Sequence, residues 1–408
     1  MPTVDEHQRA VQALLEPLSS REPELLRWAE APTGSLRDRV LARDILNPID
    51  LPLFDNSQMD GYAVRAADVA PGAKLPVAPR VAAGHAAPPI VAGTAVPIMT
   101  GAPMPVGADA VIPIEDATPD RFLPEGDGEV VAFSAPVATG AFVRPRASDL
   151  AAGQLLLAAG TRLGPAQWGV IAASGIAEVE LVPRTRVLVL STGDELVRVG
   201  EQPGPGQVFD ANGTSLALAL AESGAVVEAV VVAPDDAARL HELIDGYDVD
   251  LIVSTGGASK GAYEVVRDVF EELGVEFVSV AMQPGGPQGL GVARLANAAV
   301  PMVAFPGNPV SALVSFEVFL RPVLRAVHGL VAERWAASLP LAQALDSPPA
   351  KHQVRRGRLN RAGEVELVGG PSSHLVHSYA ASTLLVHVPV GVSHLDAGAT
   401  VEVWRIDD

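Results

Sequence analysis

The stretch Asp250-Leu-Ile-Val-Ser-Thr-Gly-Gly-Ala-Ser-Lys-Gly261 decides the fold of this chain. Its short aliphatic run, residues 250–254, is typical of a strand that is buried on both faces. A glycine-rich turn follows the run. Apolar residues then recur at helical spacing, at Val265, Val266, Val269, Phe270 and Leu273. The stretch therefore predicts one strand–loop–helix unit of an α/β protein.

The same unit repeats on both sides of this stretch. Further strands are predicted at residues 186–192, 225–233, 275–280 and 300–305, and helices at 212–223, at 235–245 and after 311. Strands that alternate with helices through short connections form a parallel sheet with helices on both faces. We therefore expect a three-layer α/β domain with a parallel sheet.

Four polar or glycine-rich segments come directly after predicted strands. They are TGDEL (192–196), APDD (233–236), TGGASKG (255–261) and FPGNPVS (305–311). Such segments emerge at the same carboxyl edge of a parallel sheet, and that edge is where doubly wound sheets bind ligands. We therefore expect one shared pocket.

Single residues of these segments also have purely structural explanations. Asp210, Asp235 and Asn308 stand where helices begin, and Asp and Asn are favoured helix N-caps. Gly256, Gly257 and Gly261 suit unusual backbone angles. The glycine-rich loop fits neither the P-loop nor the dinucleotide fingerprint. It is the convergence of the segments at one edge that favours a ligand site.

Composition excludes several classes of function. The chain has 408 residues, no cysteine and a formal net charge of −19. Thiolate metal sites and cysteine nucleophiles are therefore excluded. The negative charge argues against nucleic acid and against an anionic membrane as partners. The apolar stretch 295–316 is interrupted by prolines, and the N-terminus lacks a signal-peptide pattern. We expect a soluble, cytoplasmic protein.

Two other segments combine polar and apolar residues more densely than turns require. The first is Pro52-Leu-Phe-Asp-Asn-Ser-Gln-Met-Asp-Gly-Tyr-Ala-Val-Arg65. The second, residues 97–115, reads PIMTGAPMPVGADAVIPIE. A turn at a domain boundary does not explain why so many polar groups meet large apolar ones here, so both segments are candidates for a site.

PLFDNSQMDGYAVR, IMTGAPMPVGADAVIPIED, STGDEL, STGGASKG and FPGNPVSALVSFE, in this order, resemble the family of the gephyrin E-domain and the bacterial molybdopterin molybdotransferases. The resemblance covers nearly the whole chain. It implies four parts: an α/β domain similar to the molybdopterin adenylyltransferases (1–22 and 177–329), a connecting domain (23–45 and 142–176), a Pro/Gly-rich β domain (46–141) and a C-terminal β-barrel-like domain (330–408). It also implies a homodimer with the site at the subunit interface.

The resemblance further implies a reaction. Members of this family insert molybdate into adenylylated molybdopterin and release AMP with the help of Mg²⁺. A molybdopterin adenylyltransferase and molybdoenzymes are the implied partners. The implied catalytic residues are Asp60, Glu195 and Asp235, and the implied metal ligands are Glu264 and Asp235. The implied substrate- and nucleotide-binding residues are Thr100, Asp149, Ser191, Thr192, Gly256, Gly257, Lys260, Gln283, Pro284, Gly285, Asn308, Arg356 and Ser373.

Two positions depart from the family pattern. Glu264 stands where the family usually has an aspartate that binds Mg²⁺, and its longer side chain still offers oxygen ligands. Gln283 stands where the family commonly has a lysine that handles the oxyanion. Glutamine donates hydrogen bonds but supplies no charge, and charge-assisted bonds are about twice as strong. We hypothesise that Lys260, near Arg267 at the same sheet edge, supplies the missing charge; a solvated loop lysine is the alternative.

A metal site at His374 and His377 is not expected, because their odd spacing on a strand would point them to opposite faces. Two other functions stay open. The first is a catalytically weakened paralogue that binds the cofactor as a scaffold, which Gln283 and Glu264 favour. The second is a nucleotidyltransferase that acts on molybdopterin, which would consume ATP.

Overall fold

The central sheet predicted from the sequence is present in the structure, a computed structural model that describes residues 1–80, 84, 87–123, 129–233, 236–256, 265–296 and 298–407. Within these residues it has six strands in the order β18-β15-β19-β23-β22-β20. Their bounds are β15 (Arg186–Thr192), β18 (Val226–Ala233), β19 (Leu251–Thr255), β20 (Val275–Ser279), β22 (Pro287–Arg294) and β23 (Ala299–Phe305).

The strand directions confirm most of the expected sheet. Strands β18, β15, β19 and β23 are parallel to one another. Strand β22, which was not predicted from the sequence, runs antiparallel to both β23 and β20. Arg294 ends β22 and Ala299 begins β23, so the connection is too short for the crossover that parallel strands need.

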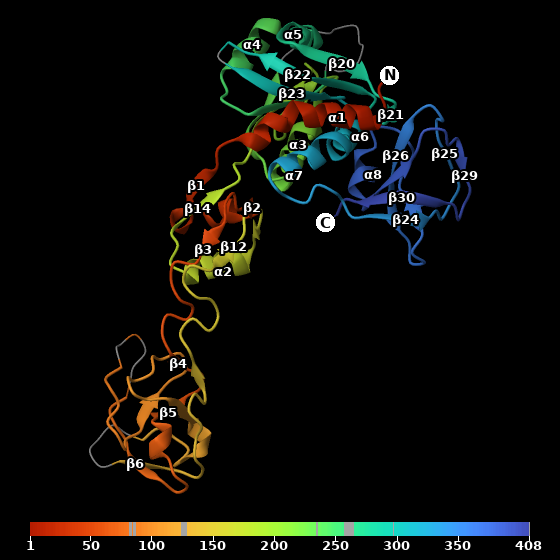
Figure 1. Ribbon diagram of the computed structural model, residues 1–408. Coiled ribbons are helices and arrows are strands. Elements are labelled where there is room, and N and C mark those ends of the chain that lie inside the picture. The colour runs from red at the N-terminus through yellow and green to blue at the C-terminus, as the bar shows by residue number, and fades with distance from the viewer. Residues whose placement is uncertain are drawn as a thin grey trace. The chain divides into compact units, whose positions relative to one another are not determined.

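Helices cover both faces of the sheet (Figure 1). Along β15, Val187 and Val189 enter one hydrophobic core, whereas Leu188 and Leu190 enter the other. This alternation explains why the strand is apolar throughout. The first core includes residues of α1 (Val4–Leu15), α3 (Ala211–Glu222), α6 (Pro309–Ser315) and α7 (Arg321–Val327), and the second includes residues of α4 (Ala237–Asp245) and α5 (Val265–Leu273).

The long helix expected after residue 311 is divided into three parts. A π-helical turn, Phe316–Leu320, separates α6 from α7. Its Glu317 is only 7% exposed, and its two carboxylate oxygens accept from Arg334 Nε at 3.1 Å and Nη2 at 3.0 Å. This two-point ion pair fixes the helix to the segment that leads into the C-terminal domain.

The C-terminal domain is built on a mixed sheet of order β21-β26-β28-β30-β24. Strand β21 comes from the α/β part and pairs with β26, with Gln283 opposite Gln353. The two domains are therefore joined through a shared sheet. The bounds are β21 (Met282–Gln283), β24 (Ala336–Pro340), β25 (Leu345–Asp346), β26 (His352–Leu359), β27 (Val365–Leu367), α8 (Val376–Ala380), β28 (Leu384–Val388), β29 (His394–Leu395) and β30 (Thr400–Arg405).

The chain divides into two compact units. Unit 1 comprises Met1–Glu24, Asp38–Val40 and Leu181–Asp408, and unit 2 comprises Leu25–Arg37 and Leu41–Glu180. Strands β1 (Glu24–Arg27), β2 (Arg39–Val40) and β14 (Glu178–Leu181) lie at the borders of the units. Unit 2 holds β3 (Ile45–Leu46), β4 (Asn56–Ser57), β5 (Gly61–Val64), β6 (Lys74–Pro76), β7 (Val96–Ile98), β8 (Ala110–Pro113), β9 (Ala117–Thr118), β10 (Val130–Phe133), β11 (Val143–Arg144), β12 (Leu155–Leu157), β13 (Arg162–Leu163) and α2 (Pro165–Ala173).

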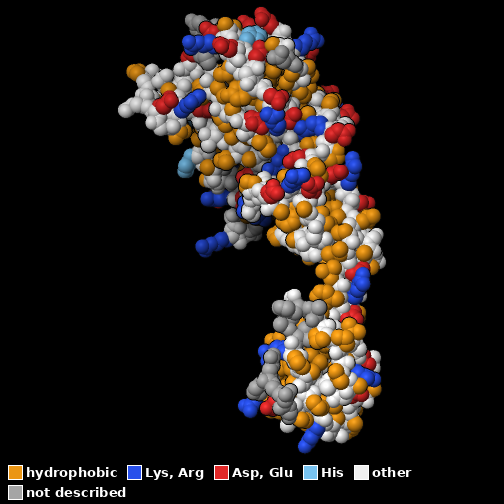
Figure 2. All heavy atoms as spheres, turned by 90° about the vertical axis from the view of Figure 1, so that its left-hand side faces the viewer, with side chains coloured by type: hydrophobic (Ala, Val, Ile, Leu, Met, Phe, Trp, Pro, Cys, Tyr) orange, Lys and Arg blue, Asp and Glu red, His pale blue; other side chains and the backbone are white. Residues whose placement is uncertain are grey.

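Unit 2 has its own core, in which Tyr62 of β5 packs against Phe133 of β10. Large hydrophobic side chains also remain exposed near its two motif segments, at Leu53, Phe54, Met99, Val106 and Phe142. Figure 2 shows hydrophobic side chains over much of the visible surface of this unit. No helix within the described residues is long and apolar enough to cross a membrane.

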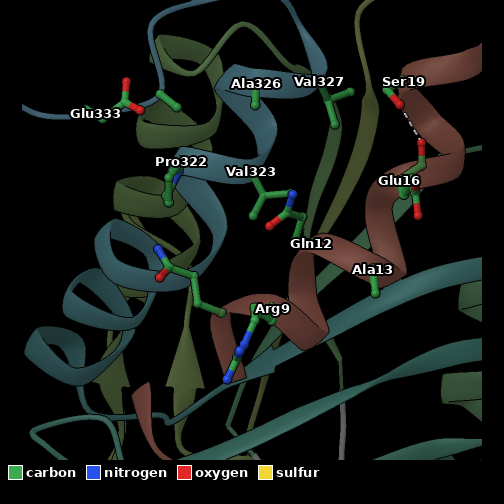
Figure 3. A pocket seen from close by; sticks show the side chains of 12 residues that line it. Arg9, Gln12, Ala13, Glu16, Ser19, Pro322, Val323, Ala326, Val327 and Glu333 are labelled. Carbon is green, nitrogen blue, oxygen red and sulfur yellow. Dashed lines mark hydrogen bonds between the residues drawn. The ribbon is translucent and has the colours of Figure 1, made fainter. Parts of the chain in front are cut away.

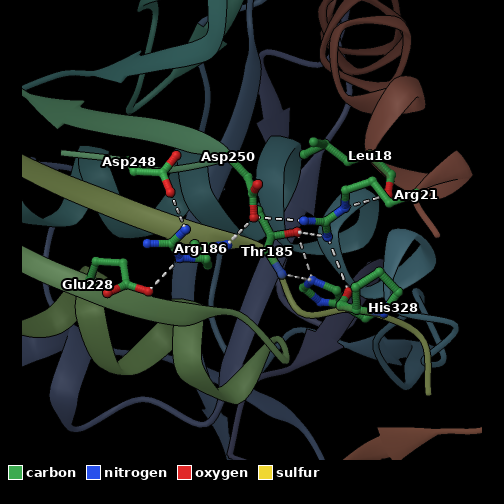
Figure 4. A network of polar contacts seen from close by, with 9 residues as sticks. Leu18, Arg21, Thr185, Arg186, Glu228, Asp248, Asp250 and His328 are labelled. Carbon is green, nitrogen blue, oxygen red and sulfur yellow. Dashed lines mark hydrogen bonds and ion pairs between the residues drawn. The ribbon is translucent and has the colours of Figure 1, made fainter. Parts of the chain in front are cut away.

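At the base of the α/β domain, His328 belongs to a buried polar network (Figure 4). Its Nε2 accepts from the backbone N–H of Thr185 at 3.1 Å, and its Nδ1 lies 2.8 Å from the carbonyl oxygen of Ser223. A carbonyl only accepts, so Nδ1 carries the proton and the ring is neutral. Burial lowers the pKa of His328 from 6.5 to about 4. Protonation at Nε2 would break the bond from Thr185.

We expect His328 to make the protein sensitive to acid. Below pH 6.5 the unfolded chain takes up a proton on this ring, whereas the folded chain does so only near pH 4. The free energy of unfolding should therefore fall by about 3 kcal/mol over this range on account of His328 alone. Urea unfolding at pH 7.5, 6.0 and 4.5 measures the effect, and His328→Gln should flatten the dependence.

The control for this prediction is His394→Gln, which should change the pH dependence with the opposite sign. His394 lies 2.7 Å from Asp346 and 3.3 Å from Asp396, and hydrogen bonds to these carboxylates raise its pKa. Its contribution is present at low pH and is lost as the pH rises through the folded-state pKa. An unchanged acid dependence in His328→Gln would contradict the assignment.

Candidate functional site

The carboxyl ends of four parallel strands meet at one edge of the central sheet. Thr192 at the end of β15 lies opposite Ala233 at the end of β18, and Ser191 lies opposite Thr255 of β19. Thr255 in turn lies opposite Phe305 of β23. The register confirms that the four segments predicted to share an edge do leave the sheet at one edge.

The backbones behind this edge approach each other very closely at Gly256. Its φ is +92°, and a Cβ on this residue would lie 2.5 Å from Thr192 Oγ1 and 2.6 Å from the Thr192 carbonyl oxygen. The N–H of Gly256 donates to the carbonyl of Phe305 at 3.2 Å. Only glycine fits here, because both the conformation and the space exclude a side chain.

Buried hydroxyl groups line the same edge. Ser191 and Thr255 are 0% and 1% exposed, and neither hydroxyl has a partner among the described residues. Thr192 differs, because its hydroxyl donates to the carbonyl of Thr255 at 3.1 Å and thereby holds two strand ends together. Ser191 and Thr255 therefore offer free hydrogen-bonding groups, whereas Thr192 has a structural bond as well.

Glu195 and Asp210 lie on the loop between β15 and α3. The backbone carbonyl of Glu195 accepts from Val208, next to a short pair formed by β16 (Leu196–Val197) and β17 (Val208–Phe209). The Glu195 side chain is exposed. Asp210 is the N-cap of α3 and accepts from Gly213 N–H at 2.9 Å. The capping explanation therefore holds for Asp210, and Glu195 is free to contact a ligand.

The loop after β23 begins α6 beside this edge. Asn308 occupies the N-cap position but makes no side-chain capping bond, so the expected capping role of Asn308 is wrong for its side chain. The exposed amide remains free. The carbonyl of Ser373, from the C-terminal domain, accepts from Val310 N–H at 3.0 Å instead. Ser373 is thereby brought to the start of α6.

The segment around Gln283 is held by side-chain amides. Gln283 Oε1 accepts from Gln353 Nε2 at 2.9 Å, and the peptide bond between Gln283 and Pro284 is cis. Gln288, which is 0% exposed, donates to the carbonyl of Gly285 and to Ser315 Oγ, both at 2.7 Å. These bonds hold the loop in place. The NH₂ group of Gln283 remains as the hydrogen-bond donor of this side chain.

Arg356 on β26 is a buried cation. It is 1% exposed, its Nη2 donates to the carbonyl of Gly370, and its Nε and Nη1 have no partner among the described residues. Burial, and then the charge of Arg355, lower its pKa. The loop that it holds leads to Ser373. An unpaired buried cation suits an anionic ligand.

Three predicted site residues lie in unit 2. Asp60 Oδ1 accepts from the backbone N–H of Thr100 at 2.7 Å and from its hydroxyl at 2.8 Å. These bonds lower the pKa of Asp60 and keep it ionised. Asp149 is exposed, and its N–H donates to the carbonyl of Leu51. The structure joins Asp60 to Thr100, but no bond joins Asp149 to them.

Four predicted site residues, Asp235, Gly257, Lys260 and Glu264, lie outside the described residues. Among the residues that are described, no group of three or more His, Asp or Glu side chains could hold a metal ion. His374 and His377 do not lie on a strand: His377 is in α8, and His374 lies two residues before the first residue of that helix. The segment between β27 and β28 forms the short helix α8.

A groove of about 720 Å³ lies elsewhere in unit 1, between α1 and α7 (Figure 3). Arg9 and Gln12 of α1 and Val323 and Ala326 of α7 are among its lining residues. None of the predicted site residues lines it. The groove is therefore separate from the candidate site at the sheet edge.

Two residues that contact the site loops were not predicted from the sequence. Asn212 of α3 donates to the carbonyl of Gly307 at 2.7 Å, and Gln353 of β26 donates to Gln283. Asn212 had a visible signal, because an asparagine two residues after a helix cap is free for another role. Gln353 had none, since the pairing of β21 with β26 joins distant parts of the chain.

Comparison with known proteins agrees with this architecture. The chain matches the MoeA N-terminal region (domain I and II) over residues 2–175, a probable molybdopterin binding domain over residues 188–326 and the MoeA C-terminal region (domain IV) over residues 338–406. A molybdopterin biosynthesis moeA protein from Pyrococcus horikosii has a similar structure, with a TM-score of 0.76 and 32% identity, covering 97% of this chain and 98% of that one.

Curated relatives extend over the full chain. Molybdopterin molybdenumtransferase 2 of Mycobacterium tuberculosis is 42% identical over 426 aligned positions, covering 100% of both chains. Molybdopterin molybdenumtransferase of Synechococcus elongatus is 34% identical, covering 90% of this chain and 91% of its own. With the α/β domain, the sheet-edge site and the C-terminal domain all present, the chain belongs to the molybdopterin molybdenumtransferase family, enzymes of molybdenum cofactor biosynthesis.

Proposed function

We propose that this enzyme inserts molybdate into adenylylated molybdopterin and releases AMP. The observation that supports this most directly is the cluster of buried, unpartnered polar groups at the sheet edge, at Ser191, Thr255 and Asn212. Buried polar groups without partners are costly unless a ligand satisfies them. The glycine at 256 allows the loops that carry these groups to pack closely together.

The chain itself supplies the binding groups for such a ligand. The hydroxyls of Ser191 and Thr255 donate to phosphoryl or ribose oxygens, and the amide of Asn308 is exposed beside them. Arg356 is a buried cation that holds the carbonyl of Gly370, in the loop that leads to Ser373 at the start of α6. These groups orient the adenylate and restrict the motion of the bond to be hydrolysed. Less entropy is then lost on reaching the transition state.

We further propose that the reaction needs Mg²⁺, held by Asp235 and Glu264, with Glu195 as a catalytic carboxylate. Carboxylate oxygens are the ligands that Mg²⁺ prefers. The exposed Glu195 side chain makes no bond to a described residue. Strands β18 and β19 end beside β15, and Asp235 and Glu264 follow them in the chain. When bound, Mg²⁺ polarises phosphoryl oxygens and neutralises their charge. Glu195 would otherwise repel the phosphate.

The oxyanion is proposed to contact the loop of residues 283–285. The fixed amide of Gln283 donates a hydrogen bond there in place of a lysine. Lys260 is proposed to supply the charge that this loop lacks. Asp60, held ionised by Thr100, and Asp149 are proposed to act in the same reaction.

The assembly is proposed to be a cytoplasmic homodimer in which a second copy completes the site. A molybdopterin adenylyltransferase that supplies the substrate and molybdoenzymes that receive the product are the proposed partners. Light scattering during size-exclusion chromatography tests the dimer directly. A monomer at the concentrations that support full activity would rule it out.

The activity is tested with purified enzyme, adenylylated molybdopterin, molybdate and Mg²⁺. We expect AMP to be released and the product to activate a molybdenum-free molybdoenzyme. Two results would favour the scaffold. In the first, AMP is released but no active cofactor forms. In the second, the protein binds the substrate but releases no AMP and forms no active cofactor. Consumption of ATP would favour a nucleotidyltransferase.

Glu195→Gln should lower kcat on the order of 100-fold, because it removes a charge that acts on the transition state. The exposed side chain makes no described bond, so the melting temperature should not change. Glu201→Gln is the matched control, since Glu201 is an exposed acid of the same loop. Equal rates for the two variants would remove Glu195 from the mechanism.

A further inference from the structure

Asn212 is buried at the start of α3 without serving as its cap. It is 6% exposed, and the capping bond of this helix is made by Asp210. Asn212 Nδ2 donates to the carbonyl oxygen of Gly307 at 2.7 Å. Its Oδ1 is buried and has no partner among the described residues. A buried acceptor without a hydrogen bond lowers the stability of the folded state, which indicates that Asn212 has a role beyond helix formation.

The bond from Asn212 fixes the position of a loop that contacts the site. A Cβ on Gly307 would lie 3.4 Å from Gly256 Cα, so the loops that follow β23 and β19 are in van der Waals contact. Gly256 in turn lies against Thr192 at the end of β15. The loops that follow β15, β19 and β23 therefore pack against one another, and Asn212 of α3 holds the loop that follows β23.

The first turn of α3, which carries Asn212, packs beside a buried hydroxyl group of the sheet edge. A Cβ on the next residue, Gly213, would lie 3.1 Å from Ser191 Oγ, so the first turn of α3 packs beside Ser191. Ser191 lies opposite Thr255 in the sheet. Asn212, Ser191 and Thr255 each carry a buried polar atom without a partner among the described residues.

We propose that Asn212 is a positioning residue of the nucleotide site. Its NH₂ group holds the Gly307 carbonyl and thereby sets the spacing between the Gly307 and Gly256 loops. Its Oδ1 accepts a hydrogen bond from a hydroxyl or amino group of the adenylate. This inference rests on the proposed function, because it takes the adenylylated substrate to bind at the sheet edge.

The test is Asn212→Asp in the full-length enzyme. This change keeps the shape but replaces the donor with an oxygen that faces the Gly307 carbonyl. We expect the Kd for AMP, measured by calorimetry, and the KM for adenylylated molybdopterin to rise at least tenfold. A residue with only a structural role would lower the melting temperature without changing either constant.

Asn47→Asp is the matched control. Asn47 is also buried, at 1% exposed, its Nδ2 donates to the carbonyl of Leu150 at 3.4 Å, and its Oδ1 likewise has no described partner. It lies in unit 2, in the segment between β3 and β4. Asn47→Asp should lower the melting temperature while the Kd for AMP stays within twofold of the wild-type value.

A second variant covers the case in which Asn212→Asp does not fold. Asn212→Ala introduces no charge and should also raise the Kd for AMP at least tenfold. A Kd and KM within twofold of wild type, in whichever variant folds, would overturn the role of Asn212. If the wild-type enzyme itself neither binds AMP nor releases it, the proposed function fails and not the role of one residue.

Discussion

Gly256→Ala should reduce molybdate insertion at least 100-fold and destabilise the protein. The φ of +92° costs an alanine about 1–3 kcal/mol. The new methyl group would also lie 2.5 Å from Thr192 Oγ1 and 2.6 Å from a backbone oxygen, so the loops at the sheet edge must move apart. A displacement of about 1 Å costs on the order of 100-fold when it separates groups that act together.

The control for this change is Gly363→Ala, in the turn between β26 and β27. Gly363 has a similar φ of +81°, but nothing lies within 4 Å of its would-be Cβ. It should show the conformational cost in urea unfolding without loss of activity. If Gly256→Ala loses stability yet keeps its insertion rate within threefold, the close contact of these loops does not shape the site.

Arg356→Met should have opposite effects on activity and on stability. The guanidinium is buried with two nitrogens unpartnered among the described residues, and its lowered pKa reflects the cost of that burial. Methionine fills a similar volume without a charge. We expect the free energy of unfolding to rise by about 1 kcal/mol, after the lost bond to Gly370 is counted. The rate of insertion should fall on the order of 100-fold if, as we propose, this cation acts on the anionic substrate.

Arg358→Met, two residues further along β26, is the matched control. Arg358 is half exposed and pairs with Glu366 at 3.1 Å, and surface pairs of this kind contribute little. Neither stability nor insertion should change much. A large loss of stability in Arg356→Met, with activity reduced only in proportion to unfolded protein, would show that Arg356 is a structural residue.

The regular elements of the α/β domain could be predicted because their signals are local. The run at residues 186–192 became β15 with the same bounds, and the run at 250–254 became β19 (Leu251–Thr255). Buried strands and amphipathic helices carry their pattern within a few residues. The direction of β22 had no such signal, since its antiparallel pairing depends on which strand it meets.

The candidate site was only partly predictable for the same reason. Ser191 and Gly256 stand in motifs that follow strands, so their place at the sheet edge followed from the α/β pattern. The amide pair of Gln283 with Gln353 and the cation at Arg356 depend on contacts between residues far apart in the chain. Unit 2 and unit 1 each hold part of the predicted residues.

The sequence alone determined the alternation of strands and helices, the edge at which the loops gather and the family to which the motifs point. Hydrophobic periodicity and glycine positions are local properties, and a chain carries them before it folds. The tertiary structure decided which buried groups keep a partner. Thr192 donates its hydroxyl to the carbonyl of Thr255, whereas Ser191, Asn212 and Arg356 keep polar atoms that have no partner among the described residues. Hydrogen-bond satisfaction depends on neighbours in space, and only packing brings those neighbours together.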